Sequence, residues 1–120
     1  MKHSTKAPTK AEQMRFEAIK IVGCIPCWLN GVSFNPCAIH HVVKGRKRLG
    51  HRHTYGNCDW HHQGYPLNGK TTKESEEIAG PSLARSPRAY HERFGSEEEL
   101  VTLCDEMIKP YIENWTGEYS

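Results

Sequence analysis

The stretch NCDWHHQG, residues 57–64, contains a cysteine–histidine pair at short spacing, followed at once by a second histidine. Two residues separate Cys58 from His61, a spacing that lets both side chains reach one metal ion from a single turn. Adjacent residues of a helix point about 100° apart, because the helix repeats every 3.6 residues. We therefore expect the segment CDWHH to open a helix or helical turn in which His61 and His62 serve different sites.

A second short-spaced pair, Cys24 and Cys27, lies in the turn-rich segment CIPCWLNG. Two such pairs separated by a loop match a structural Zn²⁺ site with three thiolates and one imidazole. The alternative is a set of buried free thiols beside an incidental histidine, but the presence of two pairs favours the ion. The predicted zinc ligands are Cys24, Cys27, Cys58 and His61.

Histidines are concentrated between residues 40 and 62, with six of the eight at positions 40, 41, 51, 53, 61 and 62. The β-branched run around IHHVV predicts a short strand from Ala38 to Val43, and HTYGN is expected to return as its hairpin partner. Strand side chains alternate, so His40 and His41 are expected on opposite faces. One of them can then meet His62 at a second metal while the other faces a substrate.

The net charge of +2 conceals an uneven distribution, because residues 28–58 contain no Asp or Glu. A run of like charge is often only a solvated face. Here it coincides with the histidine cluster, which favours a polyanion, most naturally a nucleic-acid backbone. The predicted DNA-binding residues are Lys44, Arg46, Lys47, Arg48 and Arg52.

Three helices are predicted outside this central segment. Residues 9–23 begin with Thr9 as a cap, end at Gly23, and present Met14, Ala18, Ile21 and Val22 near one face. Residues 86–95 follow a Ser-Pro start and end at a glycine. The last helix starts with a Ser96–Glu99 capping box.

The last helix carries an apolar stripe that we interpret as packing surface. It consists of Leu100, Leu103, Met107 and Tyr111, with Cys104 and Ile108 beside it. Cys104 is predicted to be a core residue, and Cys37 is not assigned. Residues 44–53 and 63–86 are predicted to be loops.

With 120 residues the chain is expected to form one small α+β domain over residues 10–115, after a flexible basic tail at residues 1–9. The core is expected at about 20–66 and a helical part at about 86–115. No secretory signal or apolar run of about 20 residues is visible, so a cytoplasmic protein with no membrane contact is expected. GYPLNGKT, residues 64–71, fits a phosphate-loop pattern but lacks a preceding strand, so no nucleoside triphosphate is expected.

The combination of C-x2-C, IHHVV, a basic loop and CDWHH resembles the HNH nuclease signature. That resemblance implies a zinc-stabilised, treble-clef-like ββα-metal core with an N-terminal helix and C-terminal helices. The chain is closer still to the phage recombination-enhancement (Ref) family of RecA-dependent nucleases, over roughly residues 10–110. Its members pair a knuckle like CIPCWLNGV with HH and a terminal C-x2-H-H, and many carry a tail like YHERFGSEEEL.

This resemblance implies a metal-dependent DNA endonuclease, encoded by a phage or prophage, that acts with RecA filaments on single-stranded or strand-exchanged DNA. His40 and His62 would hold the catalytic ion, and His41 would be the general base. The third signature position is His51 by comparison with closer relatives, or His53 by the usual HNH spacing. The ion would be Mg²⁺ or Mn²⁺, with Zn²⁺ or Ni²⁺ as alternatives because imidazole suits softer metals.

Two alternatives do not require catalysis. A zinc-containing DNA-binding accessory protein of recombination would use the same knuckle and basic loop. A purely structural interaction protein would leave the histidines unexplained.

Overall fold

The computed structural model describes residues 7–119, with side chains described as far as residue 113. Most of the predicted tail, residues 1–6, lies outside this range. The elements are α1 (Lys10–Val22), α2 (Ile25–Leu29), β1 (Ala38–His41), β2 (Val43–Lys44), β3 (Lys47–Arg48), β4 (Thr54–Asn57), α3 (Asp59–Gln63), α4 (Thr72–Ala79), α5 (Pro87–Phe94) and α6 (Glu97–Tyr119). The predicted small α+β fold is confirmed. None of the described helices is both long and apolar enough to cross a membrane.

The first helix begins and ends where the sequence predicts. Thr9 and Glu12 form a reciprocal capping box, and Gly23 ends the helix with a φ of 90°. The predicted inner face is partly wrong, because Ile21 is 44% exposed whereas Ile19 and Arg15 are buried. A search for apolar residues treats arginine as a surface residue, so it does not find that Arg15 lies on the buried face of α1.

Arg15 is buried because its guanidinium has partners on two other elements. It donates to the Thr54 hydroxyl at 2.9 Å and to the Thr54 carbonyl at 2.5 Å. It also pairs with Asp105 of α6 at 2.6 Å. One side chain thus joins α1 and α6 to the start of β4.

We expect Arg15→Met to lower the free energy of unfolding by about 2–3 kcal/mol, because hydrogen bonds from a charged group to a buried acceptor are lost. Asp105→Asn is the matched control. Since the Asp105 side chain is half exposed, its removal is expected to cost under about 1 kcal/mol. Urea denaturation of both variants measures the difference, and equal losses would mean that the ion pair matters more than the contacts with Thr54.

The predicted hairpin is confirmed: β1 pairs antiparallel with β4, and His40 lies opposite Tyr55 while His41 lies opposite Thr54. The predicted strand ends at His41, two residues early. The predicted basic loop instead contains a small second hairpin in which Val43 pairs with Arg48. Its two-residue turn has positive φ at both Gly45 and Arg46, 57° and 74°, the geometry that suits a tight hairpin.

The prediction of a loop over residues 63–86 is wrong, because it contains α4. The helix begins with a capping box between Thr71 and Glu74, a T-x-x-E signal that is present in the sequence. GYPLNGKT therefore precedes a helix, but the element before it is α3 and not a strand.

The C-terminal helices start as predicted, with Pro87 in the first turn of α5 and the Ser96–Glu99 capping box at the start of α6. Leu100, Cys104 and Ile108 form the buried line of α6, while Tyr111 is 39% exposed. The buried face of α6 therefore follows Cys104 and Ile108 instead of the predicted Leu103, Met107 and Tyr111. Cys104 is a core residue, as predicted.

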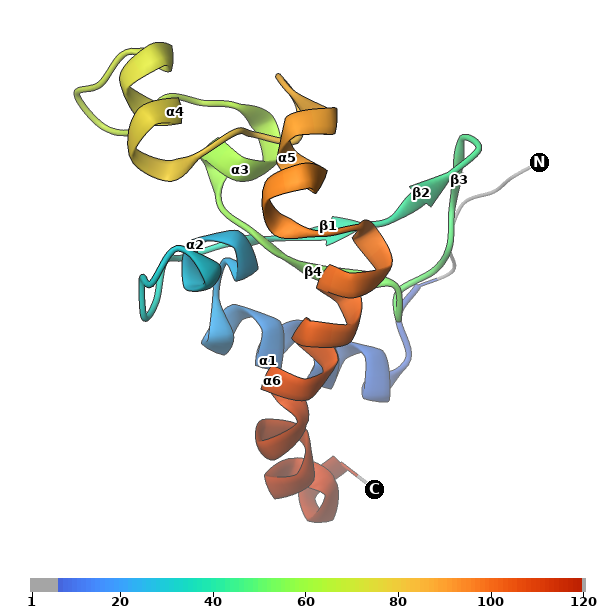
Figure 1. Ribbon diagram of the computed structural model, residues 1–120. Coiled ribbons are helices and arrows are strands. Elements are labelled where there is room, and N and C mark those ends of the chain that lie inside the picture. The colour runs from blue at the N-terminus through green and yellow to red at the C-terminus, as the bar shows by residue number, and fades with distance from the viewer. Residues whose placement is uncertain (1–6, 120) are drawn as a thin grey trace.

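Figure 1 shows α1 and α6 side by side below the β1–β4 hairpin, with α3 and α5 above it. The larger core cluster combines Ala18, Ile19, Ile25, Val42, Tyr55, Tyr90, Phe94, Leu100, Cys104 and Ile108. A smaller cluster gathers Cys24, Cys27, Cys58, Trp60 and Ala79. The hairpin and α3 are therefore held between the two clusters.

Candidate metal centre and active site

The four predicted zinc ligands lie together in the smaller cluster. Their ligand atoms are all within 4.8 Å of one another, and all four residues are buried. His61 Nδ1 lies 3.2 Å from Cys58 Sγ and 3.5 Å from the sulfurs of Cys24 and Cys27. Ligands about 2.0–2.3 Å from a tetrahedral ion are separated by roughly 3.5–3.8 Å. The cluster therefore has the dimensions and donor set of a structural zinc site.

Each pair is presented by the start of a helix. Cys24 caps α2 and accepts from the Cys27 amide, while Cys58 caps α3 and accepts from the His61 amide, both at 3.4 Å. Amide donors and the positive end of a helix favour a thiolate. Hydrogen bonds with the Cys24 and Cys27 thiols also lower the pKa of Cys58.

A carbonyl group fixes the orientation of the His61 ring. Nε2 lies 2.8 Å from the carbonyl oxygen of Ala79, the last residue of α4. If this nitrogen donates its hydrogen, the lone pair remains on Nδ1, which faces the sulfurs. The unpredicted helix α4 thus contributes directly to the cluster.

The rings of His40 and His62 are in contact, outside the cluster that contains His61. Their ring centroids are 5.0 Å apart with an interplanar angle of 75°. Burial, together with the neighbouring His40, lowers the pKa of His62, so its ring is neutral near pH 7. Two imidazoles at this spacing can hold a divalent ion between them, while His61 points into the sulfur cluster. The two adjacent histidines of α3 thus face different sites.

Glu97, the first residue of α6, is a site residue that the sequence analysis missed. Its carboxylate lies 2.9 Å from His40 Nε2 and accepts from the Tyr55 hydroxyl at 2.6 Å. Burial alone would raise the pKa of Glu97, but hydrogen bonds from His40 and Tyr55 hold it below its ordinary value. The ionised carboxylate can therefore take the hydrogen of His40 Nε2 and leave Nδ1 free for an ion.

A chain of hydroxyl groups supports Glu97 from behind. The Tyr55 hydroxyl lies 2.8 Å from that of Tyr90, which donates to Asn57 Oδ1 at 3.2 Å. Tyr55, Tyr90 and Asn57 are fully buried. No short spacing links them to His40, because His40 and Glu97 are 57 positions apart in the chain, although Tyr90 and Glu97 both fall within the tail YHERFGSEEEL.

His41 faces away from His40, as strand alternation predicts. Its ring packs edge-on against Phe16, and its Nε2 lies 3.1 Å from His51 Nδ1. Burial, followed by the charge of Arg48, lowers the pKa of His41 to about 4, so the ring is neutral near pH 7. His53 instead lines a small cavity beside α6. Of the two candidates for the third position, the structure brings His51, and not His53, to His41.

A family model described as "Recombination enhancement, RecA-dependent nuclease" matches residues 8–109 of the chain. The chain belongs to this family. The match spans every site residue described above, from Cys24 to Glu97, and confirms the resemblance to the RecA-dependent nuclease family. The family is described as a nuclease family. Cleavage of a nucleic acid is therefore the chemistry that the two histidine pairs, His40–His62 and His41–His51, would have to serve.

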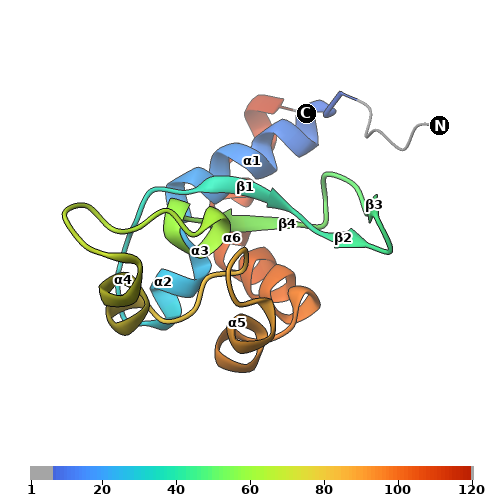
Figure 2. The same cartoon turned by 90° about the horizontal axis from the view of Figure 1, so that it is seen from above.

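In this member of the RecA-dependent nuclease family, the five predicted DNA-binding residues are all exposed. Figure 2 shows the β2–β3 hairpin, which carries most of them, extending beyond the end of β1. Lys44 pairs with Glu98 at 2.9 Å and Arg52 with Glu12 at 3.9 Å. The Lys44–Glu98 pair is exposed and contributes little, and the Arg52–Glu12 contact is long, so a polyanion can displace both.

Proposed function

We propose that this protein is a metal-dependent DNA endonuclease in which the β1–β4 hairpin and α3 form an HNH-type ββα-metal centre. The observation that carries the proposal is the division of the α3 histidines, with His61 in a Cys3His cluster and His62 beside His40. A permanent zinc in that cluster would hold α3 against the hairpin. A second, exchangeable ion would be held by His40 and His62.

The ion at His40 and His62 would supply charge stabilisation at a phosphate oxygen and at the leaving oxygen. Two imidazole ligands suit Mn²⁺, Ni²⁺ or Zn²⁺ better than Mg²⁺, which prefers oxygen. Glu97 would keep His40 turned so that its Nδ1 lone pair faces the ion. The exposed basic residues of the β2–β3 hairpin would bind the phosphates on either side.

His41 would take the proton from the attacking water. If His41 Nε2–H donates to His51 Nδ1, Nδ1 of the neutral His41 ring would carry the lone pair that accepts this proton. His51 would hold the ring in this tautomer and would stabilise the charge that forms on it. His53 has no part in this mechanism, because it lies beside α6.

We further propose that residues 10–115 form a single domain, since α1 and α6 pack together and both contact the hairpin. The family's description supports a link to RecA, so we propose that the substrate is DNA held in, or displaced by, a RecA filament. The protein would then act in the bacterial host of a phage or prophage.

Cleavage assays on single- and double-stranded DNA, with and without RecA and with each divalent ion, test the proposal. We expect cleavage only when a divalent ion is added, and most of it in the presence of RecA. One tightly held zinc with salt-dependent DNA binding, but no cleavage under any condition, would instead identify a DNA-binding accessory protein.

We expect Glu97→Gln to weaken binding of the catalytic ion by about 10–100-fold, the usual cost of losing a carboxylate behind a histidine ligand. Titration of the zinc-loaded protein with Mn²⁺, followed by calorimetry, measures the change. Glu98→Gln is the matched control, because Glu98 is the next residue but its carboxylate pairs with exposed Lys44. Identical Mn²⁺ curves for Glu97→Gln and wild type would refute the orienting role.

Replacing Lys47 and Arg48 together by alanine is expected to weaken binding to DNA of any sequence. The slope of log K against log salt should fall by about 2, because two phosphate contacts are lost. Fluorescence anisotropy at several salt concentrations measures the slope. Arg88→Ala on α5 is the control, since this arginine is also exposed but pairs with Glu92 on its own helix; a fall in slope there would argue for diffuse charge attraction.

A further inference from the structure

A cavity of about 450 Å³ adjoins the proposed centre. It lies between the segment that leads into β1, the first residues of α3 and the loop that follows α3. Ala38 in its wall precedes His40 by two residues on β1, and Asp59 precedes His62 by one turn of α3. The same two elements that would hold the ion thus also form this cavity.

The lining suits a flat polar group and not a phosphate. Asn68 and Asp59 supply hydrogen-bonding groups, whereas the Asn35 amide already donates to Cys27 Sγ at 3.3 Å, and among the described lining residues none is a lysine or arginine. A phosphate would meet the Asp59 carboxylate with no compensating positive charge. A nucleobase, which is neutral and carries donors and acceptors along its edge, would not.

Tyr65 gives the cavity an aromatic wall. Its side chain is 61% exposed, more than any other large apolar or aromatic side chain among the described residues. An exposed ring beside a polar cavity offers a base a stacking surface, and such stacking tolerates every base because each has a π-face. Pro66 and Leu67 continue this wall.

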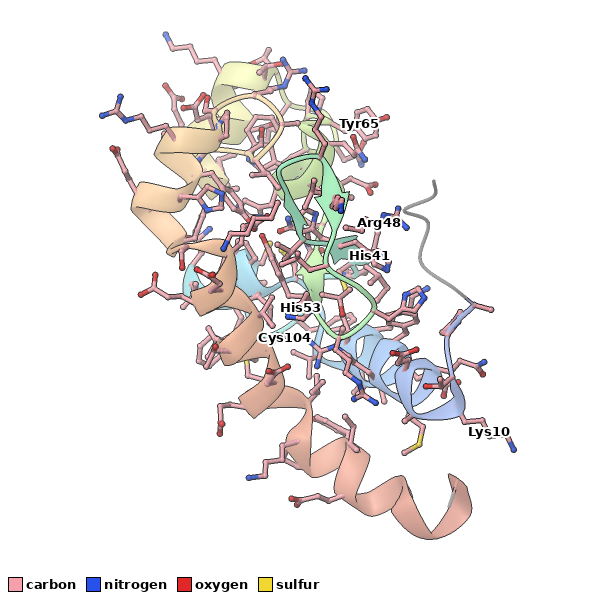
Figure 3. All side chains as sticks on the ribbon, turned by 90° about the vertical axis from the view of Figure 1, so that its right-hand side faces the viewer. Lys10, His41, Arg48, His53, Tyr65 and Cys104 are labelled. Atoms are coloured by element: carbon pink, nitrogen blue, oxygen red, sulfur yellow. The ribbon has the colours of Figure 1, made fainter. Side chains whose placement is uncertain are left out.

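The place of Tyr65 defines the path that a bound strand would follow. In the projection of Figure 3, Tyr65, His41 and Arg48 all lie on the side away from α6, whereas Figure 1 places the β2–β3 hairpin and the loop after α3 toward opposite ends of the molecule. A strand whose phosphates contact Arg48 and whose scissile group lies near His41 would therefore have to continue past α3 to reach Tyr65.

We propose that this cavity is a subsite for one unstacked nucleobase of single-stranded DNA, with Tyr65 stacked on the base and the amide of Asn68 facing its edge. The proposal rests on the proposed nuclease function, because it places the base next to the phosphate at His40 and His62. Bases in an intact duplex are stacked and paired, so the subsite favours single-stranded or strand-exchanged DNA.

The test uses single-stranded oligonucleotides that carry 2-aminopurine at successive positions, bound to the zinc-loaded full chain without added divalent ion. We expect the fluorescence to be quenched at one position. Tyr65→Ala should abolish this quenching and weaken binding roughly tenfold, whereas Tyr65→Phe should retain both. Tyr111→Ala, which removes an exposed tyrosine from α6, is the control and should behave as wild type. Zinc content and thermal unfolding check that each variant is folded.

An abasic site at the quenched position provides a second readout. It should weaken binding to the wild type roughly tenfold but weaken binding to Tyr65→Ala very little, because the stacking partner is already missing. Absence of quenching at every position, or quenching that persists in Tyr65→Ala, overturns the subsite. DNA cleavage is scored separately, so quenching that depends on Tyr65 without cleavage would retain the subsite and refute the nuclease.

Discussion

His41→Ala is expected to reduce metal-dependent DNA cleavage by about 10²–10⁴-fold, the usual contribution of a positioned general base. The side chain is partly exposed and contacts Phe16 and His51, not the zinc cluster, so its removal should leave the fold and that cluster intact. Single-turnover cleavage at saturating metal measures the effect, because it isolates the chemical step from product release.

His53→Ala is the matched control for that experiment. The substitution removes a histidine that is only two residues from His51 in the sequence. The His53 side chain lines the cavity beside α6, whereas His51 contacts His41. Its cleavage rate should remain within about twofold of wild type, since a substitution with no contact to the reacting atoms has no transition-state interaction to remove. A His41→Ala variant as fast as the wild type would disprove the role of the base, and a slow His53→Ala variant would reassign the third signature position.

Cys58→Ser is expected to abolish zinc binding and cooperative unfolding together. Structural zinc sites contribute about 10–16 kcal/mol of apparent binding energy, which is comparable with the whole stability of a small domain. Cys58 also joins β4 directly to α3, so its loss releases the helix that carries His62. Metal analysis of the purified protein and thermal unfolding by circular dichroism measure the two effects.

Cys37→Ser provides the comparison for Cys58→Ser. Its thiol is half buried near the cluster, but it contacts the carbonyl oxygen of Ile19 and is not one of the four clustered ligands. This variant should keep one zinc per chain and unfold cooperatively. A Cys58→Ser protein that is folded without zinc would show that the sulfur cluster is held together by packing alone.

The sequence predicts those parts of the site that depend on short spacings. Cys24 with Cys27, and Cys58 with His61, are each set by one helical turn, and strand alternation separates His40 from His41. The same local rules predict the β1–β4 hairpin and most helix ends. These features need no knowledge of how distant segments pack.

The features that the sequence analysis missed depend on long-range packing. Glu97 reads as one of three acidic residues in a first turn, and only the position of α6 brings it to His40. Arg15 is buried because Thr54 and Asp105 come to it from elsewhere in the chain. The choice between His51 and His53 depends on the path of the chain after β3, which spacing does not determine. Helix α4 is a different case, because its capping box is readable but its polar composition obscured it.

The chain of hydroxyl groups behind Glu97 limits how far the catalytic motif can be separated from the rest of the protein. Tyr90 and Glu97 belong to the C-terminal helices, whereas the HNH-like signature, from Cys24 to His62, lies entirely before residue 65. A fragment excised around that signature, or grafted onto a foreign scaffold, would carry the ligands without the carboxylate that turns one of them toward its ion. A minimal nuclease fragment would therefore also need α5 and the first turn of α6, which carry Tyr90 and Glu97.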